Sequence, residues 1–213
     1  MAKAVEQFNL PSFPIMIRQF LYDQLYPDSE IPSLLEVTAF PDFNGRISIF
    51  YSMTATFRAP SDNSGVNGMR REYIRATPSW RKGAPRYDCI FINTIPETEG
   101  MSRLEVGCAL AFFSFVFNDV DYQCALIHWF SRVRLEPDQD TGMSVVEPEF
   151  NTDENPHLAI IHVDSIYRAA HLNPVYRTNQ YTSQLLTMHD TLDTFKEFYV
   201  NKFADYHAFE IAF

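Results

Sequence analysis

The chain has 213 residues, of which 15% are aromatic, and a formal net charge of −10 at pH 7. This length is enough to bury one hydrophobic core, so we expect a single domain over residues 1–213. The acidic balance excludes a protein that coats DNA with its whole surface, because counterion release requires an excess of cations at the contact. Residues 1–13 lack the apolar core of a signal peptide and no run reaches the roughly 20 apolar residues of a membrane span, so we expect an intracellular protein.

Hydrophobic periodicity predicts one helix and then strands in the first third of the chain. Residues 14–26 carry apolar side chains at helical spacing between two prolines. Residues 36–39 and 46–57 alternate apolar and polar side chains in the manner of strands, and residues 44–45, Asn-Gly, have the composition of a hairpin turn. A polar loop rich in Ser, Asn and Gly follows at residues 59–68.

The centre of the chain predicts several buried strands joined by short turns. Residues 87–94 form a short apolar strand, and residues 106–117 and 122–130 form a hairpin around a tight turn at 118–121. An acidic loop follows at residues 135–142. Further strands are predicted at 143–150, where Pro148 marks an edge or an end, and at 157–163, before a brief helical segment near Asp164.

The last predicted element is an amphipathic C-terminal helix at about 190–206, because its large apolar residues recur at helical spacing. The whole pattern predicts an α+β, β-rich fold, a small antiparallel β-barrel with its core at about 36–176. Helices at about 14–26 and 190–206 would flank the barrel and cover its open faces and edges.

Residues 69–87 form a basic segment in this acidic chain. Six cations and one acid give the segment a net charge of +5, which leaves the remainder at −15, and three aromatic residues lie among the charges. Arg and Lys neutralise phosphates, while an aromatic ring stacks on a base or wedges into a groove. The residues predicted to contact nucleic acid are Arg70, Arg71, Arg75, Trp80, Arg81, Lys82 and Arg86. In the alternative interpretation, the cations pair with carboxylates of the same chain and Trp80 packs at the barrel rim.

The sequence contains no motif for a cofactor or for nucleophilic catalysis. Cys89, Cys108 and Cys124 have no CxxC spacing, so we expect free, buried thiols in a reducing compartment rather than a zinc site or a disulfide framework. Neither a GxSxG elbow nor a Walker-type glycine loop occurs. We therefore assign no catalytic residue and expect no cofactor and no metal.

The histidines leave one catalytic alternative open. His162 and Asp164 would share one face of a strand, and together with His157 or His171 they would provide ligands for a metal ion. The simpler interpretation is that these histidines are hydrogen-bonded or surface residues at strand ends, because no HExxH or comparable spacing supports a metal site. The metal interpretation corresponds to a metal-dependent hydrolase.

A family resemblance is carried by six strings in order, which together span about residues 8–213. The strings are FNGRISIFYSMTATFRAPSD, MRREYIRATPSWRKGAPRYDCIFI, CALIHWFSR, PDQDTGMSVVEPEF, IIHVDSIYRAAHLNPVY and DTFKEFYVNKFADYHAFEIAF. This set resembles the C-terminal region of Plavaka-type transposases, the large transposases of CACTA-like DNA transposons in mushroom-forming fungi. In that family an RNase H-like catalytic core with three metal-binding acids lies upstream of the region matched here. The resemblance therefore implies a nuclear, non-catalytic tail, or a stand-alone descendant of one.

A second resemblance concerns the layout of residues 104–176. The order of a hairpin, an acidic loop and two further strands is similar to that of bromo-adjacent homology (BAH) domains, which are chromatin-associated β-barrels. Aromatic cages in such barrels hold methylated lysine by cation–π attraction. The resemblance implies a candidate aromatic pocket made by Tyr122, Trp129, Phe130 and Tyr167, the alternative for Trp129 and Phe130 being packing in the core or at the rim.

Three functions follow from these patterns. The first is a non-catalytic module that associates with DNA or chromatin, in which the basic segment meets DNA and the acidic surface suits a basic histone tail. The second is a protein–protein interaction or dimerisation module that assembles the transposase, which edge strands and the aromatic C-terminal stretch would support. The third is the metal-dependent hydrolase.

Overall fold

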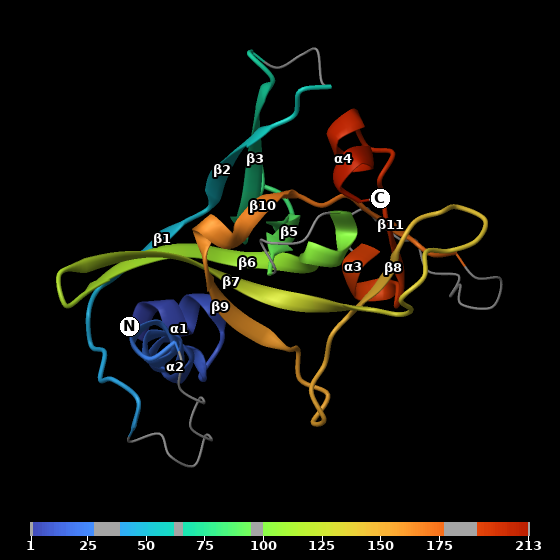
Figure 1. Cartoon of the computed structure of the whole chain (residues 1–213). Helices are drawn as coiled ribbons and strands as arrows, with labels where there is room; N and C mark the ends of the chain where they lie inside the picture. Colours follow the sequence, from blue (N-terminus) through green and yellow to red (C-terminus); the bar gives the residue numbers. More distant parts are fainter. Residues whose placement is uncertain (1, 28–38, 62–65, 95–99, 177–190, 213) are drawn as a thin grey trace.

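The computed structural model describes residues 2–27, 39–61, 66–94, 100–176 and 191–212 (Figure 1). Its largest feature is an antiparallel sheet that curls into a half-barrel, and helices are few. The β-rich fold predicted from the sequence is therefore confirmed. The strand predicted at 36–39 lies outside the described residues apart from Ala39.

A long hairpin forms the centre of the sheet. Strands β6 (Leu104–Phe117) and β7 (Val120–Arg132) pair over almost their full length, which confirms the predicted hairpin. The two residues that connect them, Asn118 and Asp119, have positive φ angles of 50° and 60°, as a type I′ turn requires. The register shifts around Leu110, so this residue forms a bulge in β6.

Seven shorter strands extend the sheet on both sides of this hairpin. They are β1 (Ile47–Phe50), β5 (Cys89–Asn93), β8 (Val145–Pro148), β9 (Leu158–His162), β10 (Ile166–Ala169), β11 (Leu172–Pro174) and β12 (Phe198–Val200). On β6, β5 pairs with the N-terminal half and β1 with the C-terminal half. On β7, β9 pairs with the middle and β8 with the C-terminal end. The brief helical segment predicted near Asp164 is a single 3-10 turn, η3 (Val163–Ser165).

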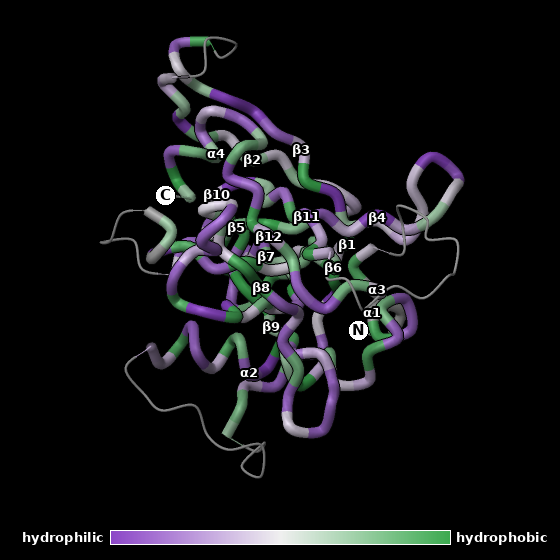
Figure 2. Tube along the Cα trace, turned by 90° about the vertical axis from the view of Figure 1, so that its right-hand side faces the viewer, coloured by the Kyte–Doolittle hydropathy of each residue, from purple (hydrophilic) through white to green (hydrophobic). Residues whose placement is uncertain are grey.

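A small second sheet stands on the half-barrel and consists of β2 (Ser52–Arg58), β3 (Met69–Thr77) and β4 (Arg86–Tyr87), in that order. The strand predicted at 46–57 is divided at Tyr51, because β1 stays beside β6 whereas β2 leaves it to pair with β3. The β2–β3 hairpin projects from the body of the molecule in Figure 1. Hydrophilic stretches mark this hairpin and the loop before β4 (Figure 2).

Two helices cover the outer side of the central hairpin near the N-terminus (Figure 1). Helix α2 (Phe13–Leu25) confirms the helix predicted at 14–26. Its fully buried Phe13 meets Phe113 of β6 edge-on, with 5.3 Å between the ring centroids. A shorter helix, α1 (Ala2–Phe8), precedes it and was not predicted from the sequence. No helix in the described part of the chain is long and apolar enough to cross a membrane.

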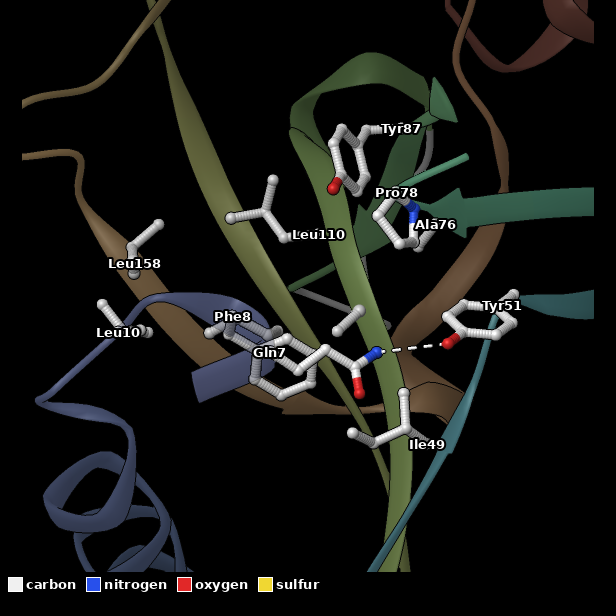
Figure 3. Close-up of a pocket in the computed structure, with 12 residues that line it drawn as sticks. Gln7, Phe8, Leu10, Ile49, Tyr51, Ala76, Pro78, Tyr87, Leu110 and Leu158 are labelled. Carbon is white, nitrogen blue, oxygen red and sulfur yellow. Dashed lines mark hydrogen bonds between the residues drawn. The ribbon is translucent and has the colours of Figure 1, made fainter. Parts of the chain in front are cut away.

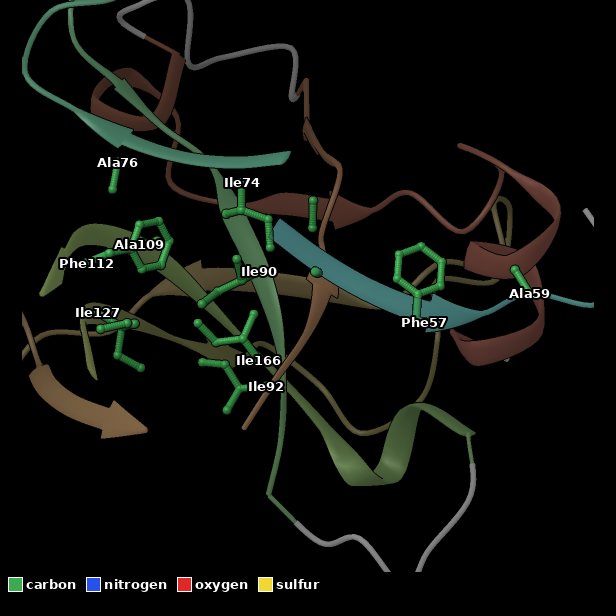
Figure 4. Packing of buried hydrophobic residues seen from close by; sticks show 13 residues of the cluster. Phe57, Ala59, Ile74, Ala76, Ile90, Ile92, Ala109, Phe112, Ile127 and Ile166 are labelled. Atoms are coloured by element: carbon green, nitrogen blue, oxygen red, sulfur yellow. The ribbon is translucent and has the colours of Figure 1, made fainter. Parts of the chain in front are cut away.

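Aliphatic and aromatic side chains fill the inside of the half-barrel (Figure 4). Ile74 of β3 and Ile90 of β5 have no exposed surface, and Phe57 of β2 is nearly as buried. Each side chain of this size contributes about 1.5–3 kcal/mol when it leaves water. On the other face of β5, β6 and β7, a second cluster around Phe130 and Phe198 holds the C-terminal part of the chain.

The C-terminal helix predicted at about 190–206 is wrong. The described residues there form one helical turn, α3 (Thr191–Thr194), then strand β12, and then helix α4 (Tyr206–Ile211). The apolar residues that match helical spacing also contain a period of two, since Phe198 and Val200 are buried on either side of a half-buried residue. β12 pairs with both β8 and β11, and this tertiary pairing outweighs the local helical pattern.

Candidate functional site

The basic segment at residues 69–87 folds into β3, a tight turn and β4. Because side chains of a strand point alternately to opposite faces, β3 divides its residues between the core and solvent. Arg71 and Tyr73 are exposed and Arg75 is half-buried, whereas Ile74 is fully buried. Arg71, Tyr73 and Arg75 therefore form one row on the outer side of the small sheet.

Strand β2 flanks this row with small polar residues. The cross-strand pairs are Arg71 with Thr56, Tyr73 with Thr54, and Arg75 with Ser52. These three β2 residues are uncharged, so the arginines of the row face no carboxylate across these pairs. Arg58, at the end of β2 and on the same face by alternation, is exposed and adds another cation.

Trp80 gathers three guanidinium groups at the end of the row. The Cζ atoms of Arg75, Arg81 and Arg86 lie 4.4, 5.4 and 5.4 Å from its ring centroid. An indole face attracts a cation by roughly 0.5–1 kcal/mol at an exposed site, so the ring holds these like charges together. Asp88 offsets part of their repulsion, because its Oδ1 accepts from Nε of Arg86 at 2.8 Å.

The turn between β3 and β4 presents two cations on a strained backbone. The N–H of Gly83 donates to the carbonyl of Trp80 at 2.8 Å and closes a turn whose central residues are Arg81 and Lys82. Both have positive φ, 51° and 65°, which is type I′ geometry. Asn and Gly adopt this geometry readily, whereas other residues lose roughly 1–2 kcal/mol there.

These residues define the outer basic face, which consists of Arg58, Arg71, Tyr73, Arg75, Trp80, Arg81, Lys82 and Arg86. The structure thus brings together six of the seven residues predicted to contact nucleic acid. The seventh, Arg70, is half-buried and alternates to the opposite side of β3, where its cross-strand partner is the buried Phe57. It does not belong to the outer basic face.

A second polar cluster, which the sequence analysis did not identify, surrounds a buried arginine. Arg168 of β10 is only 1% exposed. Its guanidinium donates to both carboxylate oxygens of Asp205, at 2.8 and 2.5 Å, and to Glu72 of β3 at 3.3 Å. Its Cζ lies 4.7 Å from the ring centroid of Phe57. Burying a charge is costly unless it is paired, and here two carboxylates and an aromatic ring compensate that cost.

His207 of α4 completes this cluster. Its Nδ1 lies 3.2 Å from Nη1 of Arg168, and its Nε2 lies 3.3 Å from the hydroxyl of Tyr167. Because arginine only donates, Nδ1 is the acceptor and the neutral ring carries its proton on Nε2. Burial and the guanidinium of Arg168 lower the pKa of His207, and the hydrogen bonds from Arg168 hold the pKa of Asp205 well below its usual range. These contacts join β3, β10 and α4, while Nε of Arg168 is buried without a hydrogen-bond partner among the described residues.

The aromatic residues considered for a methyl-lysine pocket are not brought together. Tyr122 stacks on Phe115, with 5.3 Å between ring centroids, in the cluster that α2 covers. Trp129 packs against the residues inside the half-barrel, and Phe130 belongs to the cluster on the other face. Tyr167 lies beside the buried Arg168 cluster. The four residues therefore do not surround one cavity.

The residues considered as metal ligands also form separate pairs. Nδ1 of His162 lies 3.4 Å from a carboxylate oxygen of Asp164, and Nδ1 of His157 lies 3.0 Å from Glu149. His171 is exposed beyond β10. Within the part of the chain that the structure describes, no three His, Cys, Asp or Glu side chains are placed to hold one metal ion.

A small cavity of about 210 Å³ lies between the end of α1, residues 49–51 and the bulge of β6 (Figure 3). Its walls are mostly apolar and include Phe8 and the bulge residue Leu110. Gln7, Tyr51 and Tyr87 add polar atoms, and the Gln7 amide donates to the Tyr51 hydroxyl at 3.4 Å. Burial raises the pKa of the Tyr87 hydroxyl. The volume is below that of most small-molecule sites, so we base no function on this cavity.

Comparisons with known proteins give no family assignment. The chain matches no family model, no curated protein and no solved structure.

Proposed function

We propose that the protein is a non-catalytic module that binds DNA through the outer basic face. The observation that carries the proposal is the stack of Arg75, Arg81 and Arg86 around Trp80, in a chain whose net charge is −10. Guanidinium groups form bidentate hydrogen bonds with phosphates, and a ring that already holds them sets their spacing before binding. Tyr73 is 57% exposed in the same row and offers a surface for stacking on a base.

The pairing of the cations favours an external partner over a purely internal role. Arg86 is paired with Asp88, but neither Arg71 nor Lys82 forms an ion pair with any residue that the structure describes. Both side chains are exposed. The remainder of the chain is strongly acidic and repels phosphate, so DNA would be confined to this one face.

The resemblance to transposase tails supplies a setting for this activity. The catalytic acids of that family lie upstream of the matched region, so we propose an accessory role in the nucleus without cleavage of DNA. A module of this kind would hold transposon-end or nucleosomal DNA while another part of the transposase performs the chemistry. A BAH-like barrel and contact with a histone tail belong to the same proposal.

The test of the proposal is the binding of duplex DNA, measured by fluorescence anisotropy at several salt concentrations. Arg71, Arg81 and Lys82 are replaced together by Ala, because all three are exposed. If they contact phosphates, the affinity falls and the plot of log K against log salt becomes less steep by about 2.7, from roughly 0.9 per lost contact. Arg70 is left in place because it faces the other side of β3.

A matched control removes three cations from elsewhere on the surface. Arg46, Arg134 and Lys196 are exposed and lie outside the outer basic face, so their replacement by Ala changes the net charge by the same amount. Weaker binding by the first variant alone supports the proposal. Equal losses in both variants, or no binding by the wild type at low salt, contradict it.

A second candidate function is self-association through the C-terminal segment. Phe203, Tyr206 and Phe209 are 61%, 74% and 43% exposed, and Nζ of Lys202 lies 5.5 Å from the ring centroids of Phe203 and Phe209. Exposed aromatic groups of this kind are enriched where protein partners bind. Analytical ultracentrifugation of the wild type and of a variant with Phe203→Ser and Tyr206→Ser tests this candidate. A dimer that the variant loses supports it, and a wild-type monomer at high concentration excludes it.

A further inference from the structure

Two cysteines face each other across the pairing of β5 and β6. Cys89 and Cys108 are direct cross-strand partners, and both are free and buried. The neighbouring pair, Asp88 and Ala109, is hydrogen-bonded, because the N–H of Ala109 donates to the carbonyl of Asp88. The carbonyl of Cys89 points to the opposite side of β5, where it accepts from the N–H of Ala170, just after β10. The backbone groups of Cys89 therefore point away from β6. In an antiparallel ladder this makes Cys89 and Cys108 a non-hydrogen-bonded pair.

This type of pair brings two side chains closest together. Its Cα atoms are about 4.5 Å apart, which lies within the range of about 4.4–6.8 Å that a disulfide spans. The Cys108 thiol lies near enough to raise the pKa of the Cys89 thiol, and burial adds to this shift. The Cys108 thiol also reaches the carbonyl of Tyr87, with 3.8 Å between Sγ and O. A bond between the two sulfurs therefore requires little movement of the backbone.

We propose that Cys89 and Cys108 form a redox pair that hydrogen peroxide converts into a cross-strand disulfide. One thiolate attacks the peroxide, the O–O bond breaks, and the sulfur becomes a sulfenic acid while one water leaves. The second thiol then attacks the sulfenic sulfur, the S–S bond forms and another water leaves. The two sulfurs together lose two electrons, which the peroxide gains, and both thiol protons end in water.

The third cysteine, Cys124, provides an internal reference. Its cross-strand partners are Phe113 on β6 and His162 on β9, so no second thiol lies opposite it. Burial and the nearby Asp121 raise the pKa of the Cys124 thiol to about 12, and the adjacent Cys108 thiol together with burial also raises the pKa of Cys89. The lack of an opposite thiol is therefore what separates Cys124 from the pair. We therefore expect Cys124 to stay reduced under conditions that oxidise the pair.

The position of the pair gives the disulfide a consequence for the rest of the fold. Cys89 follows the end of β4 by two residues, and β4 leads directly from the turn that carries the outer basic face. A bond from Cys89 to Cys108 would fasten this end of the small sheet to the central hairpin. Oxidation of the two thiols does not require DNA binding.

The proposal is tested by counting thiols in the purified full chain after treatment with hydrogen peroxide. Free thiols are measured in denaturant with a chromogenic thiol reagent, and intact mass is measured in parallel. The expected result is a fall from three thiols to one and a mass lower by two hydrogens, with a peptide map that joins Cys89 to Cys108. Reduction with dithiothreitol should restore all three thiols.

Two variants and a second route to oxidation complete the test. Cys124→Ser should fall from two thiols to none, whereas Cys89→Ser should form no intramolecular link. Because the pair is buried, the chain is also refolded in a buffer of oxidised and reduced dithiothreitol, so that the pair equilibrates before the core closes. Three remaining thiols in both experiments, a link that includes Cys124, or conversion to sulfinic acid without a link overturns the proposal.

Discussion

Arg168 and Asp205 are 37 residues apart in the sequence and join through two hydrogen bonds where β10 meets the start of α4. Asp205 is also the N-cap of α4, since its carboxylate accepts from the N–H of Ala208 at 2.7 Å. One carboxylate thus pairs with a buried guanidinium and caps the first turn of a helix. This contact adds to the pairing of β12 with β8 and β11 and to the apolar cluster around Phe198, which together attach the C-terminal segment to the half-barrel.

Replacing Asp205 by Asn should lower the free energy of unfolding by about 3 kcal/mol. The variant keeps a side chain that can cap α4, but it leaves the buried Arg168 with Glu72 as its remaining carboxylate, and breaking a buried ion pair is costly. Asp205→Ala should lose about 1 kcal/mol more, because the cap is also removed. Urea denaturation followed by circular dichroism measures both changes.

A surface pair serves as the control for this substitution. Asp42 lies 3.0 Å from Arg18 and its side chain is 88% exposed, so Asp42→Asn should cost less than about 1 kcal/mol. Equal losses from Asp42→Asn and Asp205→Asn would show that the Arg168 cluster does not stabilise the fold.

The stability of the protein should decrease as the pH falls below about 6.5. His207 has a lower pKa in the folded protein than in the unfolded chain, so the unfolded state binds more protons once its histidine begins to titrate near that pH. The loss ends when the pH drops below the folded pKa. His207→Gln should flatten the plot of unfolding free energy against pH between pH 7 and pH 5. The control His171→Gln, at an exposed position, should leave the slope of this plot unchanged. An unchanged curve in His207→Gln would contradict the lowered pKa of His207 in the folded protein.

Hydrophobic periodicity correctly predicted the elements in which the sequence of the element itself determines which face is buried. Helix α2 and the hairpin of β6 and β7 are such elements, because each carries one continuous apolar pattern. The division of the strand at 46–57 was not predictable in this way. Tyr51 continues the alternation, but its neighbours change partner from β6 to β3, and β3 was marked in the sequence by its charges alone. Residues 198–200, predicted to lie in a helix, form β12 because they pair with β8 on one side and β11 on the other.

The candidate site shows the same limit. Composition alone located the basic segment, but it could not place Arg70 and Arg71 on opposite faces, because that depends on β3 being a strand. The buried cluster was missed because Arg168 and Asp205 approach each other only in the folded chain. The one signal in the sequence is an arginine within the otherwise apolar stretch IYRAA at residues 166–170.

At residues 81–82, substitutions that stabilise the turn should weaken DNA binding. Replacing Arg81 by Asn and Lys82 by Gly should raise the free energy of unfolding by about 1–2 kcal/mol, because Asn-Gly suits the positive φ angles of this type I′ turn. The same variant loses two cations and should bind DNA more weakly. Urea denaturation and fluorescence anisotropy measure the two effects.

An Ala-Ala turn separates these effects. Arg81→Ala with Lys82→Ala removes the same charges but keeps residues that are strained at positive φ, so it should weaken DNA binding without stabilising the fold. If the Asn-Gly variant binds DNA as tightly as the wild type, the turn does not contact phosphate.

Trp80→Ala should distinguish the arrangement of the cations from their number. The variant keeps every charge of the outer basic face, so the salt dependence of DNA binding, which counts released counterions, should stay close to that of the wild type. The affinity should nevertheless fall about tenfold at each salt concentration, because Arg75, Arg81 and Arg86 lose the ring that holds them together and must be ordered on binding. Trp80→Phe, which keeps a smaller ring, should lie between the two. Equal affinities for the wild type and Trp80→Ala at every salt concentration would mean that the stack has no part in binding, and the three arginines would then act only as independent charges.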